Sequence, residues 1–190
     1  MHKIHGTYCA ALTPLNKDYS INKELFLEHC NNLLSQNLEG LAIFGSTGEG
    51  NSFNVNEKIE AVNYLIDNNI SADKLIPGTG LCSIKDTVLF SKAMAKLKVK
   101  TILVLPAFYY KGVSNEGVVE FYKRVIDEVG ESDLQYILYH IPKVTGVFIG
   151  FEVIEQLIKL FPKNVVGMKD SNENLDNMLK IIKYFNNFSL

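Results

Sequence analysis

Residues 101–141 read TILVLPAFYYKGVSNEGVVEFYKRVIDEVGESDLQYILYHI, and this stretch decides the fold. It begins and ends with continuous apolar runs, Thr101–Leu105 and Gln135–Ile141, as expected of strands buried on both faces. Between them, apolar side chains recur at the spacing of one helical face: Val118, Phe121, Tyr122, Val125, Ile126 and Val129. Ser114 is the predicted N-cap of this helix. The stretch therefore predicts two parallel strands joined by a helical crossover.

The same pattern of apolar run, turn and amphipathic stretch extends in both directions along the chain. The other apolar runs are Ile4–Ala11, Gly40–Phe44, Leu75–Gly78 and Val165–Met168, and a further run begins at Phe188. Helical stretches lie between or after these runs. Asn54 with Glu57 predicts a capping box at the start of one helix, and Ser83 with Asp86 marks the start of the next. Strand–helix units about thirty residues apart predict an α/β protein with a parallel sheet.

Two architectures have this pattern, an open doubly wound sheet and a closed (β/α)8 TIM barrel. A nucleotide-binding open sheet has a glycine-rich turn after its first strand, whereas Cys9–Pro14 contains no glycine. We therefore predict the barrel, with about six βα units and the start of strand 7 within a single domain, residues 1–190. Such barrels usually need about 250 residues, so we expect the C-terminal part of the barrel to be missing from this sequence.

Composition argues against several classes of partner. The formal net charge of −2, without long runs of like charge, does not favour nucleic acid or an anionic membrane. The N-terminus lacks the apolar segment of a signal peptide, and no apolar stretch is long enough to span a membrane. The three cysteines fit neither a disulfide framework nor a zinc site, and the four histidines are scattered without ligand spacing, so we expect no metal and a cytoplasmic protein. Cys30 lies on an apolar helical stripe and is expected to be a buried core thiol.

Catalytic groups in such barrels sit at the C-terminal ends of the strands. Lys169 directly follows the apolar run Val165–Met168, which places its amine at the barrel mouth. One interpretation is a solvated lysine at a strand end. The other is a nucleophile that forms an imine with a ketone, since an apolar environment favours the neutral amine that such chemistry needs.

Tyr139 lies near the end of the run Gln135–Ile141, where it is either core filler or a proton donor and acceptor. Alternation along the strand makes Leu138 and His140 face one way and Tyr139 the other. We therefore interpret His140 as a structural or supporting residue, although histidine is a common acid–base group.

The turn after Gly40–Phe44 reads GSTGEG, residues 45–50. Successive backbone N–H groups between glycines can form a nest for an anion, and Ser46 and Thr47 add hydroxyls. A phosphate-binding loop would need a Gly-Lys-Ser/Thr sequence, so a carboxylate is the better guest. The alternative is a tight turn that needs glycine for its backbone angles. In the loop after Thr101–Leu105, three consecutive aromatic residues, 108–110, suggest a subunit contact or the wall of a site, or else a hydrophobic plug.

These segments together resemble the dihydrodipicolinate synthase / N-acetylneuraminate lyase superfamily. The matching motifs are Gly45-Ser-Thr-Gly-Glu49, Tyr139-x-x-Pro142 followed by Thr145-Gly146, and Gly167-x-Lys169-Asp170. The resemblance covers essentially the whole sequence. It implies an eight-stranded barrel with a helical C-terminal extension that this sequence lacks, and a homotetramer built as a dimer of dimers.

The resemblance also implies roles for individual residues. Lys169 matches the lysine that forms a covalent imine with pyruvate, without any other cofactor, and Tyr139 matches the tyrosine that moves protons. Ser46 matches the hydroxyl that links that tyrosine to a second tyrosine, for which Tyr110 is the best match and Tyr109 remains possible. The carboxylate site of pyruvate corresponds to Thr47 and the backbone around Gly45 and Gly48.

The resemblance implies a pyruvate-dependent aldolase or lyase acting on an aldehyde, a keto-deoxy sugar acid or a sialic-acid-like substrate. Alternatives are dihydrodipicolinate synthesis, dehydration of a keto-deoxy sugar acid, or a pyruvate-binding regulatory protein without catalysis. True dihydrodipicolinate synthases have an arginine two residues after the proline of the tyrosine motif, where this sequence has Val144. Valine cannot bind a carboxylate, so the family motif leaves the second substrate open.

Overall fold

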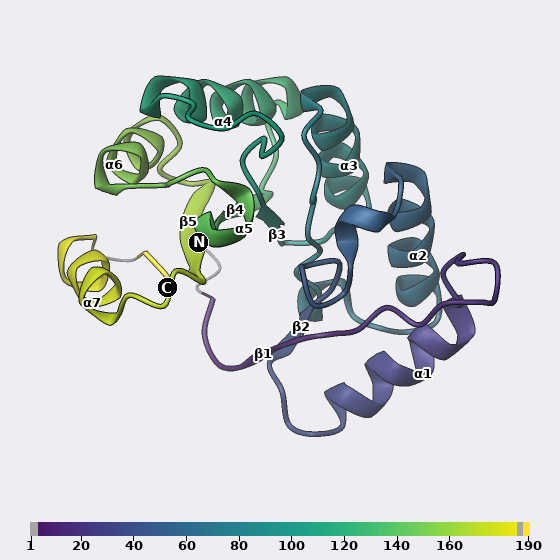
Figure 1. The fold of residues 1–190 in the computed structure, drawn as a ribbon. Coiled ribbons are helices and arrows are strands. Elements are labelled where there is room, and N and C mark those ends of the chain that lie inside the picture. The colour runs from purple at the N-terminus through teal and green to yellow at the C-terminus, as the bar shows by residue number, and fades with distance from the viewer. Residues whose placement is uncertain (1–3, 186–187) are drawn as a thin grey trace.

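The computed structural model describes residues 4–185 and 188–190 and has an α/β architecture of parallel strands and helices. The strands are β1 (Tyr8–Ala10), β2 (Gly40–Ala42), β3 (Thr101–Val104), β4 (Gln135–His140) and β5 (Val165–Asp170). The longer helices are α1 (Lys23–Leu34), α2 (Val55–Asp67), α3 (Ile84–Lys96), α4 (Asn115–Val129), α6 (Phe151–Leu160) and α7 (Leu175–Tyr184). Short helical turns lie at Gly50–Ser52, Ala72–Lys74 and α5 (Pro142–Thr145). The longer helices surround the strands on the outside (Figure 1).

All strand pairs are parallel, as the strand–helix pattern predicted. β1 pairs with β2, and β3-β4-β5 form a second sheet in chain order. The predicted third strand, Leu75–Gly78, is not a regular strand, but its backbone joins the two sheets. Ile76 donates its N–H to Leu41 on one side (2.8 Å), and Leu103 donates to Pro77 on the other (2.9 Å). Pro77 has no N–H to donate, which interrupts a regular ladder at this position.

The run that begins at Phe188 also pairs as predicted. Ser189 donates its N–H to Val166 (2.9 Å) and accepts the N–H of Met168 (2.8 Å), and its bridge to Gly167 is parallel. A further strand therefore begins beside β5. β5 itself extends to Asp170, two residues past the predicted apolar run, so that Lys169 lies within the strand and not after it.

The predicted helix starts are confirmed by their caps. The Asn54 side chain accepts the N–H of Glu57 while Glu57 accepts the N–H of Asn54, which completes the capping box of α2. Ser83 and Ser114 accept N–H groups in the first turns of α3 and α4. Each cap satisfies backbone donors that a helix leaves unpaired at its N-terminus.

Two apolar layers explain why the strand sequences are continuous apolar runs. The outward side chains of the strands pack against the helices in one large core, which includes the fully buried Cys30 on α1. Burial raises the pKa of the Cys30 thiol to about 12, as expected of an inert core cysteine. The inward side chains form a second, smaller cluster of Ile76, Leu103, Leu105, Ile137 and Tyr139. Among the described residues, no helix is both long and apolar enough to cross a bilayer.

The turn after β2 is strained and tightly packed. Phe44 is buried and has a φ of 56°, a left-handed conformation that is costly for a bulky residue. Gly50 lies against it so closely that a Cβ added there would be 1.9 Å from the Phe44 carbonyl oxygen. Only glycine fits this contact, because a methyl group would force the two backbone segments apart.

We expect Gly50→Ala to lower the free energy of unfolding by about 3 kcal/mol, the cost of overpacking against a backbone that cannot move away. Gly117→Ala in α4 is the matched control, because its Cβ would have only the Ser114 hydroxyl as a neighbour, at 3.8 Å. The control should be neutral or stabilising by about 0.5 kcal/mol. Urea denaturation measures both, and equal stability of the two variants would contradict the strained contact.

Candidate active site

Three predicted residues come together at the C-terminal ends of β4, β5 and β2. Tyr139 of β4 is paired in register with Lys169 of β5, so both side chains leave the sheet on the same face. The Lys169 Nζ lies 3.4 Å from the Tyr139 hydroxyl, to which it donates, and 4.4 Å from the centre of the Tyr139 ring. The Tyr139 hydroxyl is also 3.1 Å from Ser46 Oγ, in the turn after β2. A continuous Ser46–Tyr139–Lys169 relay of polar atoms results.

Tyr139 is held by the inner apolar cluster. Its side chain is only 4% exposed and packs with Leu105 and Ile137, while its hydroxyl reaches the polar end of the cluster. A phenol placed in this way can both donate and accept a proton, which is what shuttling between an amine and a substrate requires. The opposite facing of Leu138, which lies in the outer core, confirms the predicted alternation.

Lys169 is half-buried and lines a cavity of about 680 Å³. The wall of this cavity includes the apolar strand side chains Ile76, Leu103 and Ile137. The wall also includes the two ends of the described chain, residues 4–6 and 188–190, whereas Tyr139 and Ser46 do not line this cavity.

The turn that we predicted to bind a carboxylate is closed by its own backbone hydrogen bonds. Gly50 donates its N–H to Gly45 (3.1 Å) and Glu49 donates to Ser46 (3.2 Å), so the chain curls tightly on itself. Gly48 is buried, and its carbonyl accepts the Thr13 hydroxyl at 2.7 Å, which ties the turn to the segment after β1. Thr47 is exposed, next to Ser46.

Tyr110 lies apart from these residues. It is 76% exposed, and its ring packs edge to face against Tyr109 at 5.2 Å. Hydrogen bonds among the described residues connect Tyr139 to Ser46 and Lys169, but none reaches the Tyr110 hydroxyl. The structure of a single chain therefore does not bring Tyr110 to the relay, and its role stays a prediction.

His140 occupies the outer face of β4, as the alternation predicted. It is fully buried, its Nδ1 accepts the N–H of Ile149 at 3.1 Å, and its ring packs edge to face on Phe148. Burial lowers the pKa of His140, and the partly opposing charge of Asp170 does not reverse this effect. A neutral histidine pointing away from Tyr139 is a structural residue rather than an acid–base group of this site.

Sequence reasoning missed three residues that hold the turn in place. Lys58 of α2 donates to the carbonyls of Gly50 and Thr79, Asn51 donates its side-chain amide to the Gly80 carbonyl at 3.1 Å, and Thr13 donates to Gly48 as described above. A signal for Lys58 was present in the sequence. It lies at helical spacing with Ala61, Val62 and Leu65 on the buried face of α2, where a lysine is unusual.

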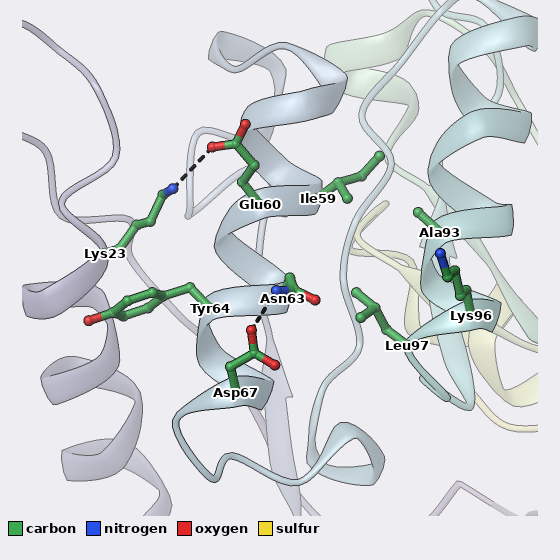
Figure 2. A pocket seen from close by; sticks show the side chains of 9 residues that line it. All are labelled: Lys23, Ile59, Glu60, Asn63, Tyr64, Asp67, Ala93, Lys96 and Leu97. Atoms are coloured by element: carbon green, nitrogen blue, oxygen red, sulfur yellow. Dashed lines mark hydrogen bonds and ion pairs between the residues drawn. The ribbon is translucent and has the colours of Figure 1, made fainter.

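A second hollow, of about 480 Å³, lies outside the strands among α1, α2 and α3 (Figure 2). Its polar side chains pair with one another, Lys23 with Glu60 at 3.0 Å and Asn63 with Asp67 at 2.6 Å (Figure 2). Polar groups that pair with each other in this way leave less capacity to bind a ligand, so we assign the site to the relay of Ser46, Tyr139 and Lys169.

Comparisons with known proteins show what the chain as a whole resembles. The 4-hydroxy-tetrahydrodipicolinate synthase of Listeria welshimeri is 33% identical over 174 residues, which cover 91% of this chain and 58% of the relative. The crystal structure of dihydrodipicolinate synthase from Agrobacterium tumefaciens has a TM-score of 0.89 at 28% identity, over 93% of this chain and 61% of that one. A variant of Sulfolobus solfataricus 2-keto-3-deoxygluconate aldolase in a pyruvate complex has a TM-score of 0.84 at 25% identity, over 96% of this chain and 59% of that one.

The chain spans 58–60% of the length of the first curated relatives that it matches. The similar structures indicate a TIM-barrel fold, which the sequence favoured over an open sheet. The model described as "Dihydrodipicolinate synthetase family" matches residues 3–190, almost the whole sequence, and the chain therefore belongs to this family.

Proposed function

We propose that the protein is a pyruvate-dependent class I aldolase or lyase in which Lys169 forms the imine. The observation that carries this proposal is the relay of Ser46, Tyr139 and Lys169, with the amine 3.4 Å from a buried phenol hydroxyl. Membership of the family supports it, as does the pyruvate complex of the similar aldolase. In this mechanism the covalent imine is itself the electron sink, so that no separate cofactor enters the steps.

The geometry supports the following sequence of steps. The pyruvate carboxylate is held at Thr47 and the backbone N–H groups between Gly45 and Gly48. The Lys169 amine attacks the ketone carbon, the ketone oxygen takes up protons and leaves as water, and a protonated imine remains. Loss of a proton from the methyl carbon gives an enamine, which adds to the carbonyl carbon of an aldehyde, and water then hydrolyses the imine. Tyr139, polarised by Ser46, carries these protons. The reverse sequence cleaves the product and releases pyruvate.

Borohydride trapping tests the proposal. In the full-length protein, reduction in the presence of pyruvate should add the mass of one pyruvate less one water plus two hydrogens, and peptide mapping should place it on Lys169. A protein that takes up no adduct would be inconsistent with imine chemistry. Turnover assays with aldehydes and with 2-keto-3-deoxy sugar acids then identify the second substrate.

The second candidate is 4-hydroxy-tetrahydrodipicolinate synthesis, which the similarity to the Listeria synthase favours. Val144 argues against it, because this position lacks the arginine of the synthases and has instead an apolar side chain that is 68% exposed. Adjacent Lys143 pairs with Glu173 and does not supply a free cation in its place. Aspartate semialdehyde turnover faster than that of sugar-derived aldehydes would favour the synthase.

The wider organisation follows from the same proposal. We infer that the described strands form six βα units and the start of strand 7 of one eight-stranded barrel domain, supported by the parallel bridge between Gly167 and Ser189. The exposed Tyr109 and Tyr110 support a dimer in which Tyr110 reaches the partner's site, within a homotetramer. Light scattering on the full-length protein measures that assembly. The free thiols of the cysteines support a reducing, cytoplasmic location.

A further inference from the structure

Lys58 is a charged side chain placed where the hydrophobic effect alone would place an apolar one. It lies on the inner face of α2 and is 0% exposed, whereas Glu60 and Asn63 of the same helix face the outer hollow (Figure 2). Burying an ammonium group is costly unless its hydrogen-bond donors are satisfied. The contacts of Lys58 therefore indicate which part of the structure the buried ammonium group stabilises.

The Lys58 ammonium joins the two turns that follow β2 and the Leu75–Gly78 segment. It donates to the Gly50 carbonyl at 3.2 Å and to the Thr79 carbonyl at a shorter distance. Its third side faces the Phe90 ring of α3, 5.5 Å from the ring centre, a cation–π contact. Because the Gly50 N–H donates to the Gly45 carbonyl and closes the turn, the ammonium group anchors the end of the Gly45–Gly50 turn.

The other two ties to this region are neutral. Thr13 holds the Gly48 carbonyl and Asn51 holds the Gly80 carbonyl. Lys58 is the charged tie among these three, and bonds from a charged donor are stronger than neutral ones. It also donates to the Gly50 carbonyl, in a turn that follows the left-handed Phe44, and such backbone persists only where its surroundings hold it.

We propose that Lys58 is a positioning residue that keeps the Gly45–Gly50 turn in the shape that binds the pyruvate carboxylate. The inference rests on the proposed function of that turn, and it assigns Lys58 no contact with the substrate. Its ammonium group acts through the two carbonyls, which fix the directions of the neighbouring backbone N–H groups. Without the ammonium group, the Gly50 carbonyl of this turn and the Thr79 carbonyl of the neighbouring turn lose their cationic donor.

Because the anchor is an ammonium group, the anchoring of the Gly45–Gly50 turn depends on pH. Burial lowers the pKa of Lys58 to about 8, against the opposing effect of Asp86 at the first turn of α3. Lys85, the neighbour of Asp86, is exposed and pairs with Glu128 on α4, at 2.8 Å. Lys58 is therefore mostly protonated below about pH 8, and it loses its positive charge as the pH rises through that value.

Through Lys58, a rise in pH above 8 has opposite effects on folding stability and on pyruvate binding. Because the pKa of Lys58 is lowered in the folded protein from 10.5, the unfolded chain holds more protons between about pH 8 and 10.5, and stability increases with pH in that window. The contribution of Lys58 to folding stability therefore does not explain a loss of pyruvate affinity above pH 8. A weakening above pH 8 that wild type shows and Lys58→Arg lacks points to Lys58.

The test compares Lys58→Met and Lys58→Arg with the exposed control Lys85→Met in the full-length protein. The measured quantity is the pyruvate concentration that half-saturates borohydride trapping at Lys169, at several pH values from 7 to 9, alongside the melting temperature. We expect Lys58→Met to raise half-saturation about tenfold at pH 7, the effect of losing a charge-assisted bond, while saturating pyruvate still gives the Lys169 adduct. Lys58→Arg, which stays charged, should remain near wild type and lose the inflection near pH 8.

The outcomes test the role of Lys58 and the proposed imine chemistry separately. A folded Lys58→Met protein with wild-type half-saturation would overturn the role of Lys58 and leave the imine untouched. A wild-type protein that traps no pyruvate would instead overturn the proposed function. If Lys58→Met fails to fold, the wild-type profile decides, since half-saturation that stays flat or falls across pH 8 contradicts the proposal.

Discussion

Replacing Lys169 with methionine should abolish pyruvate trapping and lower aldolase turnover by about 10⁴-fold or more, the scale of losing a covalent nucleophile. The physical reason is that Lys169 supplies the only amine that donates to the Tyr139 hydroxyl among the described residues. Methionine preserves the length of the side chain and the apolar wall of the cavity, so the fold should persist. Intact-mass analysis after borohydride reduction and steady-state turnover measure the two effects.

Lys180→Met is the matched control for this experiment. Lys180 lies exposed on α7, so the control makes the same substitution away from the relay. It should trap one pyruvate and turn over like wild type. If Lys169→Met still carried an adduct, peptide mapping would identify another lysine as the nucleophile, and the assignment of this site would be wrong.

Tyr139→Phe should lower turnover by about 10²- to 10³-fold, the usual contribution of a general acid–base group. The phenyl ring keeps the packing of Tyr139 in the inner cluster, so stability should change little. Only the hydroxyl between Ser46 and Lys169 is removed, which interrupts proton transfer but not the nucleophile. Trapping at Lys169 should therefore reach the same final extent as in wild type, at a lower rate.

Two variants calibrate the loss at Tyr139. Tyr136→Phe removes a hydroxyl on the outer face of the same strand, where the oxygen is buried without a hydrogen-bond partner among the described residues, and it should keep wild-type turnover. Ser46→Ala removes only the bond that polarises Tyr139 and should cost about tenfold or less, the worth of one hydrogen bond. Equal turnover of Tyr139→Phe and wild type would assign the proton transfers to another group.

The predicted elements agree best with the structure where short-range patterns specify them. The helix of Val118–Val129, the caps at Asn54, Ser83 and Ser114, and the alternation at Tyr139 all depend on residues within a few positions of one another. Hydrogen bonding at a helix end and burial of one face act over the same short range. The regular strand predicted at Leu75–Gly78 was wrong because Pro77 interrupts the ladder, although the segment still joins the sheets.

The sequence by itself determined the parallel α/β organisation and the order of the motifs that contain Lys169, Tyr139 and Ser46. Only the tertiary structure decided which polar groups meet, since Ser46 and Tyr139 are 93 residues apart, and only it separated Tyr110 from them within one chain. It also decided that Lys58, one lysine among many in the composition, is the fully buried lysine among the described residues and holds the turn. Periodicity encodes which face of an element is apolar, whereas the desolvation and pairing of a single charged group depend on segments that approach only after the chain has folded.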